Sequence, residues 1–310
     1  MKKVFIDGSA GTTGLRIIER LEKRNDIELI RLTEENRKDL NARKKALNDA
    51  DIAFLCLPDA AAVEAVSLIE NENTVVIDAS TAHRTNSDWA YGFPELSEEY
   101  ENKIKNSKRI ANPGCHASGF IALIYPLVEK GIINSDVLLS CTSLTGYSGG
   151  GKKMIAEYED DNMNALLKAP RQYGLNQTHK HLPEMKAITG IKNAPAFMPI
   201  VSDFYSGMEV IIPLFKENLN VGFSIQDIKN TYKDKYCGPI VNFVENFEES
   251  GFCSANKLSF KDTMEISVSG NEDRILLIAR YDNLGKGASG AAVECMNIVL
   301  GADKTTGLEI

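Results

Sequence analysis

The stretch KKVFIDGSAGTTG, residues 2–14, decides the fold that this sequence predicts. An apolar strand ends in glycines at three-residue spacing, and Leu15, Ile18 and Leu21 then recur at the spacing of a helix. A glycine-rich turn between a strand and a helix lets backbone N–H groups approach a pyrophosphate, with the helix N-terminus behind them. The glycine spacing is wider than in the common dinucleotide fingerprint. The prediction of a dinucleotide site therefore depends on the position of this turn between a strand and a helix. The residues expected to contact a dinucleotide are Gly8, Ser9, Gly11, Thr12, Thr13 and Gly14.

The alternation of strands and helices continues through the N-terminal third of the chain. Further strands are predicted over residues 27–32, 51–57, 74–78 and 109–111, and a helix over residues 60–69. This order is typical of a parallel sheet with helices on both faces, in which ligands bind at the carboxyl ends of the strands. Pro58, which closes the third strand, is therefore another expected cofactor contact. Residues 78–96 form a polar connector without helical or strand periodicity.

The pattern changes beyond Lys130. Strands are predicted over residues 137–144, 194–201, 208–215, 263–268 and 274–281, and a helix over residues 225–235. Such strands suit a mixed or antiparallel sheet. The predicted fold class is α/β, with a Rossmann-type dinucleotide-binding domain of residues 1–113 and 285–310 and an inserted α+β domain of residues 114–284. Residues 282–290 are expected to form a glycine loop that opens the final helix and accepts an anion or amide.

The second strand carries no acidic residue at its end to accept a hydrogen bond from a ribose 2′-hydroxyl. Arg31, Arg37 and Lys38 lie nearby instead, and a 2′-phosphate favours cations. The sequence therefore favours NADP over NAD, with Arg31 as a cofactor contact. The alternative is that these cations only solvate a surface loop and helix. The cluster Arg43-Lys44-Lys45 is assigned to a solvated helix face.

Asn112-Pro113-Gly114-Cys115-His116 places a thiol directly after a tight turn. The pattern from Ala117 to Lys130 is apolar and helical, so Cys115 is predicted at a helix N-terminus. Unpaired N–H groups and the helix dipole favour the thiolate there, and the thiolate is the nucleophilic form. The alternative is a cysteine that only packs in a Pro-Gly turn.

The remaining cysteines and the histidines limit the possible chemistry. The six cysteines are scattered without metal-type spacing, which fits reduced thiols in a cytoplasm, and no metal site is expected. Cys56, Cys141 and Cys295 lie in apolar segments and are interpreted as packing residues. Two of the four histidines, His179 and His181, precede Pro183-Glu184, and one of them could form a thiolate–imidazole pair with the nucleophile.

A second glycine-rich segment, residues 145–152, contains Ser148 and Lys152. It could bind a phosphate or carboxylate through N–H groups and one cation, or serve only as a mobile linker.

The composition is that of an ordinary soluble globular protein, with 43% hydrophobic and 25% charged residues and a formal net charge of −8. This charge argues against nucleic acid or a membrane as the main partner and favours a small-molecule substrate.

Four motifs occur together and in the order of a known family. They are Asn112-Pro113-Gly114-Cys115, Gly146-Tyr147-Ser148-Gly149, His179-x-His181-x-Pro183-Glu184 and Asp282-Asn283-Leu284-x-Lys286-Gly287-Ala288. The chain resembles the N-acetyl-gamma-glutamyl-phosphate reductase family of arginine biosynthesis over nearly its whole length. The connector Asp78-Ala79-Ser80-Thr81-Ala82-His83-Arg84 is similar to that of the shorter subclass.

The resemblance implies an NADPH-dependent reduction of an acyl phosphate to N-acetylglutamate semialdehyde and phosphate. Cys115 would form a thioester, with His181 as the acid/base, although the roles of His179 and His181 could be exchanged. The inserted domain would carry catalysis and assembly into dimers or tetramers. Asn283 and Gly287 would contribute to cofactor binding. The candidates for binding substrate are Arg84, Asn112, Ser148, Lys152, His179 and Glu184.

Three alternatives remain open from sequence. An acyl-phosphate reductase of lysine biosynthesis, acting on an aminoadipyl substrate, shares this scaffold and much of the motif set. A cysteine hydrolase or acyltransferase would not need the Gly8–Gly14 turn, and a dinucleotide sensor would not need the thiol. His116 departs from the common family pattern, in which an aromatic residue often follows the cysteine. It is expected to be accessory, because adjacent residues on a helix do not face each other.

Overall fold

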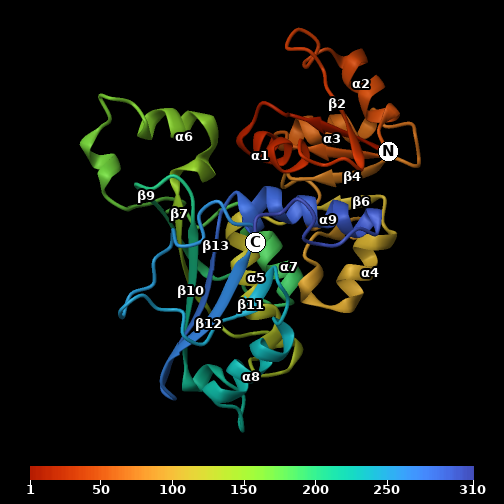
Figure 1. The fold of residues 1–310 in the computed structure, drawn as a ribbon. Coiled ribbons are helices and arrows are strands. Elements are labelled where there is room, and N and C mark those ends of the chain that lie inside the picture. Colours follow the sequence, from red (N-terminus) through yellow and green to blue (C-terminus); the bar gives the residue numbers. More distant parts are fainter. The chain divides into compact units, whose positions relative to one another are not determined.

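The computed structural model describes all 310 residues, which form two compact units (Figure 1). The first comprises Met1–Gly114 and Ala288–Leu308, and the second comprises Cys115–Gly287 with Glu309–Ile310. The C-terminal segment therefore returns to the first unit from Ala288. Residues 285–287 belong to the second unit, where Gly287 packs against Cys115.

The first unit is built on a six-stranded, all-parallel sheet in the order β2-β1-β3-β4-β6-β5. Its strands are β1 (Lys2–Asp7), β2 (Ile27–Ile30), β3 (Ile52–Leu55), β4 (Val75–Asp78), β5 (Ala90–Tyr91) and β6 (Arg109–Ala111). Every residue of β3 and β4 is buried, as expected for a parallel sheet covered on both faces. Strands β2 and β3 lie on opposite sides of β1, so the strand order reverses there, and ligands bind at such a point in open α/β sheets.

Helices cover both faces of this sheet. They are α1 (Thr12–Leu21), α2 (Leu40–Asp49), α3 (Asp59–Ser67), α4 (Glu98–Asn106) and α9 (Gly290–Leu300). Alternate residues of β1 point to opposite faces: Val4 and Ile6 pack in the core that includes α1, α4 and α9, and Phe5 packs in the core that includes α2 and α3. The doubly wound α/β arrangement predicted from the sequence is confirmed.

The connector of residues 78–96 is more regular than expected. Ala90 and Tyr91 form β5, which pairs with Ile110 and Ala111, and a 3₁₀ turn follows at Pro94–Leu96. Helix α4 then starts at a Ser97 cap, whose hydroxyl accepts a hydrogen bond from the Tyr100 amide at 3.3 Å. A two-residue strand is too short to show periodicity, so tertiary pairing alone determines it.

The second unit contains a seven-stranded mixed sheet in the order β11-β12-β13-β10-β7-β9-β8. Its strands are β7 (Ser140–Gly146), β8 (Arg171–Gln172), β9 (Ala196–Ser202), β10 (Met208–Phe215), β11 (Val241–Phe243), β12 (Met264–Gly270) and β13 (Arg274–Tyr281). The pairs β7–β9 and β11–β12 are parallel and the other pairs are antiparallel. β10 and β13 have the predicted bounds and pair over their full length.

Helix α5 (Cys115–Glu129) packs on one face of this sheet, against β10 and β13. Helices α7 (Leu182–Thr189) and α8 (Ile225–Lys235) contact α5, whereas α6 (Gly151–Tyr158) packs against the 3₁₀ turn Tyr147–Gly150. Along β10, Val210, Ile212 and Leu214 are buried, whereas Ile211 and Pro213 are half-buried and Phe215 is 58% exposed. The face of β10 away from α5 thus carries half-buried apolar residues beside the buried Glu209, and it opens to solvent at Phe215.

One expectation about a glycine-rich segment is wrong, and one of the two alternatives for another such segment is excluded. Residues 285–289 form a π-helical turn that continues directly into α9, so no open glycine loop precedes that helix. Residues 147–150 form a 3₁₀ turn and Gly151 begins α6, so the second glycine-rich segment is not a linker. In the first case, the buried Asp282 carboxylate accepts hydrogen bonds from the amides of Leu284 and Gly285 and fixes the turn.

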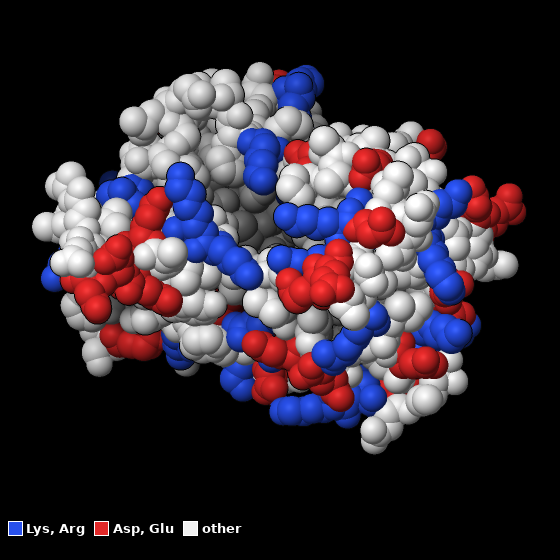
Figure 2. Space-filling model, turned by 90° about the horizontal axis from the view of Figure 1, so that it is seen from above, with Lys and Arg blue, Asp and Glu red and all other residues white.

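Basic and acidic side chains are interspersed on the face of the molecule that Figure 2 shows. That face offers no continuous basic surface of the kind that nucleic acid requires. Among the helices, none combines the length and the apolar character needed to span a bilayer.

The expected solvated face at residues 43–45 is wrong for Arg43. Its guanidinium is buried and pairs with the Asp7 carboxylate at 3.0 Å and with Glu64 at 2.9 Å. Lys44 and Lys45 do lie at the surface, where they pair with Glu70 and Asp49. Burial raises the pKa of Asp7 although Arg43 opposes this effect. The pair thus compensates a buried charge at the carboxyl end of β1.

We expect Arg43→Ala to destabilise the protein by about 3–5 kcal/mol, because it leaves the buried Asp7 carboxylate without its counter-charge. The single tryptophan, Trp89, lies in the first unit, so its fluorescence during urea unfolding reports on this unit. Lys44→Ala is the control, and loss of its exposed ion pair should cost no more than about 1 kcal/mol. Equal small losses in both variants would contradict the interpretation.

Candidate active site

The turn after β1 requires glycine at two of its three glycine positions. Gly8 has φ +85°, and a Cβ there would lie 2.2 Å from the Cys56 carbonyl oxygen at the end of β3. A Cβ on Gly14 would lie 2.6 Å from the Gly8 carbonyl oxygen. Only glycine lets the turn approach β3 and fold against the first turn of α1. The N-terminus of α1 therefore opens at the point where the strand order reverses.

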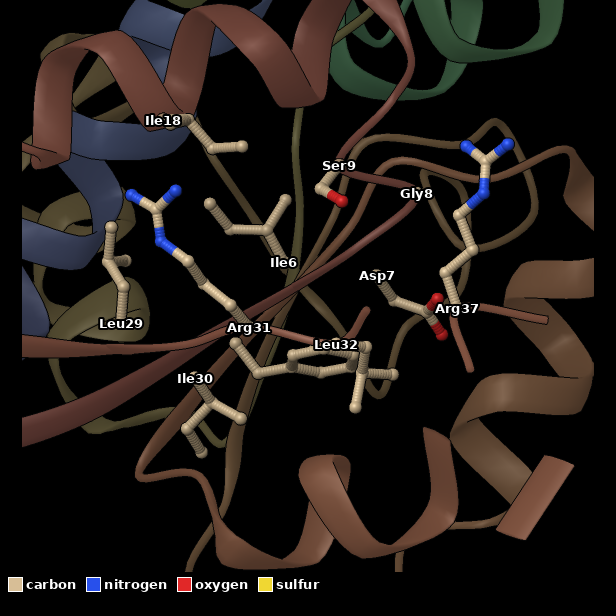
Figure 3. A pocket seen from close by; sticks show the side chains of 11 residues that line it. Ile6, Asp7, Gly8, Ser9, Ile18, Leu29, Ile30, Arg31, Leu32 and Arg37 are labelled. Atoms are coloured by element: carbon tan, nitrogen blue, oxygen red, sulfur yellow. The ribbon is translucent and has the colours of Figure 1, made fainter. Parts of the chain in front are cut away.

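Three adjoining pockets surround this turn in the first unit. One contains Gly8 and Ser9 together with Arg31 and Arg37, whose side chains lie on opposite sides of it (Figure 3). The second continues past Arg37 to Lys38 and Arg43. The third is lined by Gly11, Thr12, Thr13, Cys56, Leu57 and Ala79. Pro58 is exposed beside the third pocket as the N-cap of α3, and Gly14 is buried beneath the turn. The predicted cofactor residues of this unit thus gather at one edge of the sheet.

The charges at these pockets suit an anion. Arg31 is exposed and pairs with Glu22 at 2.8 Å, and Arg37 pairs with Glu34 at 2.9 Å. Exposed ion pairs of this kind contribute about 0–1 kcal/mol, so both arginines can exchange a carboxylate for a phosphate at little cost. Asp7 also lines the pockets, but it is compensated by Arg43. These residues, with the turn in which a Cβ would not fit, form a cradle of the kind that binds a nucleotide.

Two residues predicted to bind substrate, Arg84 and Asn112, lie at the end of β6 and hydrogen-bond to the main chain there. The buried Arg84 guanidinium donates to the carbonyl oxygens of Asn112 and Ala79, both at 2.9 Å. The Asn112 side-chain amide donates to the Ala288 carbonyl at 3.0 Å, and its backbone N–H donates to Asp78. These bonds fix the turn that leads to Cys115, and a role of either side chain in substrate binding stays a prediction.

Ser148 and Asn283 form another structural pair within the second unit. Both are 1% exposed, and the Asn283 amide donates to the Ser148 hydroxyl at 3.0 Å while its oxygen accepts from the Gly207 amide at 2.9 Å. The predictions of Ser148 as a substrate residue and Asn283 as a cofactor residue stay predictions. Their polar groups join the end of β7 to the segment after β13.

Cys115 is half-buried at the first residue of α5, as the sequence predicts. Gly287, a predicted cofactor residue, packs on Cys115 within the second unit: a Cβ on Gly287 would lie 3.2 Å from the Cys115 Cβ. Lys152 is exposed in the first turn of α6. The thiol therefore occupies the anion-favouring end of a helix, with backbone rather than a side chain above it.

Three histidines gather in the second unit around His116, the residue that follows Cys115 in the chain. The ring of His116 lies 5.5 Å from that of His179 and 5.6 Å from that of His181, and the last two rings lie 4.7 Å apart. His181 caps the N-terminus of α7, and Glu184 is buried in the first turn of that helix. The three histidines do not form a metal-ligating group. The packing of α5 against α7 thus brings together the two histidine-containing segments.

His116 occupies the middle of this cluster. Its Nδ1 lies 2.7 Å from the Ser143 hydroxyl, and its Nε2 lies 2.7 Å from the Tyr173 hydroxyl. Tyr173 is close enough to Cys115 for the charge of the thiolate to raise the tyrosine pKa, although burial is the larger cause. Ser143 and Tyr173 carry no sequence motif, so only the fold reveals them.

Burial keeps two of the histidines neutral. It lowers the pKa of His116 to about 3, with His179 as a smaller cause, and the pKa of His179 to about 4, with Lys180 as a smaller cause. The Nδ1 of His179 accepts a hydrogen bond from the His181 backbone N–H at 3.2 Å. Near neutral pH, His116 and His179 therefore act as neutral hydrogen-bonding groups.

We expect the free energy of unfolding to fall as the pH is lowered from about 6.5 towards 3. In this range the histidine is protonated in the unfolded chain, whereas buried His116 stays neutral in the folded protein. This group can contribute a slope of up to about 1.4 kcal/mol per pH unit. Urea unfolding followed by circular dichroism at pH 7, 6 and 5 measures the slope. His116→Gln should flatten it, and parallel slopes in wild type and variant would refute the assignment.

Two family models match the chain in the order of its units. The model described as "Semialdehyde dehydrogenase, NAD binding domain" matches residues 3–106. The model described as "Semialdehyde dehydrogenase, dimerisation domain" matches residues 115–283. Among solved structures, aspartate semialdehyde dehydrogenase II of Vibrio cholerae superposes with a TM-score of 0.73 at 16% identity, covering 97% of this chain and 98% of the other. The enzyme of Candida albicans with NADP gives a TM-score of 0.67 at 17% identity, covering 99% of each chain.

Curated relatives are similar over nearly the whole chain. N-acetyl-gamma-glutamyl-phosphate reductase of Sinorhizobium medicae is 44% identical over 307 residues, covering 97% of this chain and 99% of the relative. A second reductase of this name, from Nostoc, is 42% identical over 318 residues and covers 99% of each chain. The resemblance seen in the sequence motifs is thereby confirmed. This chain belongs to the N-acetyl-gamma-glutamyl-phosphate reductase family.

Proposed function

We propose that the protein reduces N-acetyl-gamma-glutamyl phosphate to N-acetylglutamate 5-semialdehyde and phosphate with NADPH, as a step of arginine biosynthesis. The observation that carries this proposal is Cys115 at the first residue of α5, in a chain that is 44% identical to a reductase of that name. The helix N-terminus favours the thiolate, and the buried histidines beside it supply hydrogen-bonding groups.

The cofactor that we propose is NADPH, which supplies a hydride when bound. The N–H groups of the Gly8–Gly14 turn would bind its pyrophosphate, because glycine leaves the backbone accessible there. Arg31, Arg37 and Lys38 would bind the 2′-phosphate. The preference over NADH is our inference from these cations and from the lack of a carboxylate at the end of β2.

In the proposed reaction, the Cys115 thiolate attacks the acyl carbonyl and phosphate leaves, forming a thioester. The hydride that bound NADPH would supply would convert the thioester to a thiohemiacetal, and its collapse would release the aldehyde and regenerate the Cys115 thiolate. His181 is our choice for the group that protonates the thiohemiacetal oxygen and later removes that proton. His116 and His179 are held neutral by burial, which supports their assignment as hydrogen-bonding groups rather than proton donors.

For substrate binding, we retain three of the sequence candidates. Lys152 is an exposed cation suited to the phosphate, and Glu184 and His179 adjoin the histidine cluster. The side chains of Arg84, Asn112 and Ser148 already donate to or accept from protein groups, so we assign them to positioning. Glutamyl specificity is chosen over the aminoadipyl substrate of lysine biosynthesis because of the names of the relatives.

A second copy of this chain is the partner that we propose. The matched dimerisation model covers the second unit, and the face of its sheet away from α5 carries half-buried Ile211 and Pro213 beside exposed Phe215 and Leu276. Pairing of these faces would remove apolar surface from water. All six cysteines are free thiols, which persist in reducing compartments, so we place the enzyme in the cytoplasm.

We expect Cys115→Ser to abolish turnover while changing the affinity for NADPH by no more than a few-fold, because the thiol and the glycine turn belong to different units. Reduction of the acyl phosphate is followed by the absorbance of NADPH, and binding by its fluorescence. Substantial activity in this variant would exclude the thioester mechanism. If the wild type binds NADPH but shows no reductase activity, the result would favour a dinucleotide sensor. If the wild type does not bind NADPH, the result would favour a cysteine hydrolase or acyltransferase.

We expect Arg37→Glu to lower kcat/KM with NADPH by roughly 10–100-fold, because the loss of one or two charge-assisted hydrogen bonds has an effect of this size. The kcat/KM with NADH should change only slightly. Lys45→Glu is the matched control, since it reverses an exposed charge on α2 that lines none of the pockets. A parallel loss with both cofactors would contradict a 2′-phosphate site.

The assay in the reverse direction tests the substrate assignment. The enzyme is mixed with NADP, phosphate and either N-acetylglutamate semialdehyde or its aminoadipyl homologue, which is longer by one carbon, and the appearance of NADPH is recorded. We expect at least a tenfold preference in kcat/KM for the shorter aldehyde, the size of effect that one methylene commonly produces. A preference for the longer aldehyde would assign the protein to lysine biosynthesis.

A further inference from the structure

The first turn of α5 is built around a side chain from the sheet. In a regular helix, the Gly119 N–H would donate to the Cys115 carbonyl, four residues earlier. The phenol oxygen of Tyr281 binds both of these groups: it donates to the Cys115 carbonyl at 2.5 Å and accepts from the Gly119 N–H at 3.1 Å. A residue at the end of β13 therefore holds the helical turn that presents the thiol.

The sequence makes room for this phenol. A Cβ at residue 119 would lie 2.7 Å from the Tyr281 hydroxyl oxygen and 2.7 Å from a methyl group of Val210. Glycine within a helix costs about 1 kcal/mol relative to alanine. Gly119 therefore makes α5 less stable, but it lets the Tyr281 hydroxyl reach the helix backbone. Tyr281 is fully buried, and burial together with the nearby Cys115 raises its pKa well above the ordinary value. Its hydroxyl thus remains a hydrogen-bond donor.

The chain after Tyr281 encloses Cys115 from a second direction. The Gly287 N–H donates to the Asp282 carbonyl at 3.0 Å, which folds the segment back on itself. A Cβ on Gly287 would lie 3.2 Å from the Cys115 Cβ and 3.4 Å from the Tyr281 ring. Residues 281–287 therefore contact both the main chain and the side chain of Cys115.

We propose that Tyr281 is a positioning residue for the nucleophile: its hydroxyl, by binding the Cys115 carbonyl and the Gly119 N–H, fixes the first turn of α5 and hence the direction of the thiolate. The proposal rests on the function proposed above. Tyr281 contacts no reacting atom in it and acts only through the backbone of Cys115.

The same helix supplies a matched control. Pro126 interrupts α5 and cannot donate to the carbonyl of Ala122, which instead accepts a hydrogen bond from the Tyr236 hydroxyl at 2.7 Å. Tyr236 is 1% exposed, so Tyr236→Phe and Tyr281→Phe each remove a buried hydrogen bond from a tyrosine hydroxyl to a carbonyl of α5. Tyr281→Phe also removes the acceptor of the Gly119 N–H. The two sites differ in distance along the helix from Cys115.

The experiment compares Tyr281→Phe with Tyr236→Phe in the full-length protein. Both variants should lower the midpoint of urea unfolding. Only Tyr281→Phe should lower kcat, by roughly 10–100-fold, with KM and the Kd for NADPH unchanged within a few-fold, because a misplaced nucleophile impairs the chemical step rather than binding. Equal losses of kcat in both variants, or a wild-type kcat in Tyr281→Phe, would overturn the proposal.

Alkylation of Cys115 by iodoacetamide gives a readout that does not depend on turnover. The rate, followed by mass spectrometry of the peptide that contains Cys115 between pH 5 and 10, should change at least fivefold in Tyr281→Phe and stay at the wild-type value in Tyr236→Phe. An unchanged rate profile in Tyr281→Phe would also overturn the proposal. Failure of the proposed function would appear separately, as activity in Cys115→Ser.

Gly119→Ala tests the same contact if Tyr281→Phe does not fold. The new methyl group displaces the phenol while alanine favours the helix, so the same loss of kcat and the same change in alkylation rate are expected. Wild-type values for both quantities in Gly119→Ala would overturn the proposal.

Discussion

In the proposed reaction the nucleophile is Cys115, the first residue of the buried helix α5, and the backbone of this helix must be satisfied within the second unit. Helix α5 is enclosed along most of its length, so each backbone polar group that its own hydrogen bonds do not satisfy needs a partner from the protein. Tyr236 binds the carbonyl left by Pro126, Tyr232 binds the carbonyl of Leu123, and Tyr281 binds the first turn. Of these three tyrosines, Tyr281 is the one that binds the backbone of Cys115 itself.

Burial also sets the electrostatics around the thiol. His116 and His179 lie among aromatic side chains such as Tyr173 and Phe197, and desolvation keeps both imidazoles neutral. Since these histidines carry no positive charge, the N-terminal end of the helix dipole supplies positive potential at the thiolate. In the first unit, the buried charge of Asp7 is compensated by Arg43, so the exposed arginines beside it stay available to an anion.

Much of the fold could be predicted because its elements have strong local patterns. β10, β13 and α8 have the predicted bounds, since alternating apolar residues or a helical period cover each of them completely. β5 and the π-helical turn at Gly285–Ser289 were missed, because pairing with β6 and the carboxylate of Asp282 stabilise them. The prediction that Arg43 lies at the surface is wrong. In a run of three basic residues, the sequence does not show which side chain is buried.

The sequence by itself determined the class of each site: a glycine turn where a Cβ would collide with neighbouring backbone, and a thiol at the start of an apolar helix. Both follow from short-range sterics and helix geometry. The tertiary structure decided which polar side chains remain available and which ones bind the protein itself. Arg84, Ser148 and Asn283 fall in motifs yet satisfy buried groups, whereas Tyr173 and Tyr281 fall in none and lie beside Cys115. The reason is that burial and hydrogen-bond partners come from residues far apart in the chain.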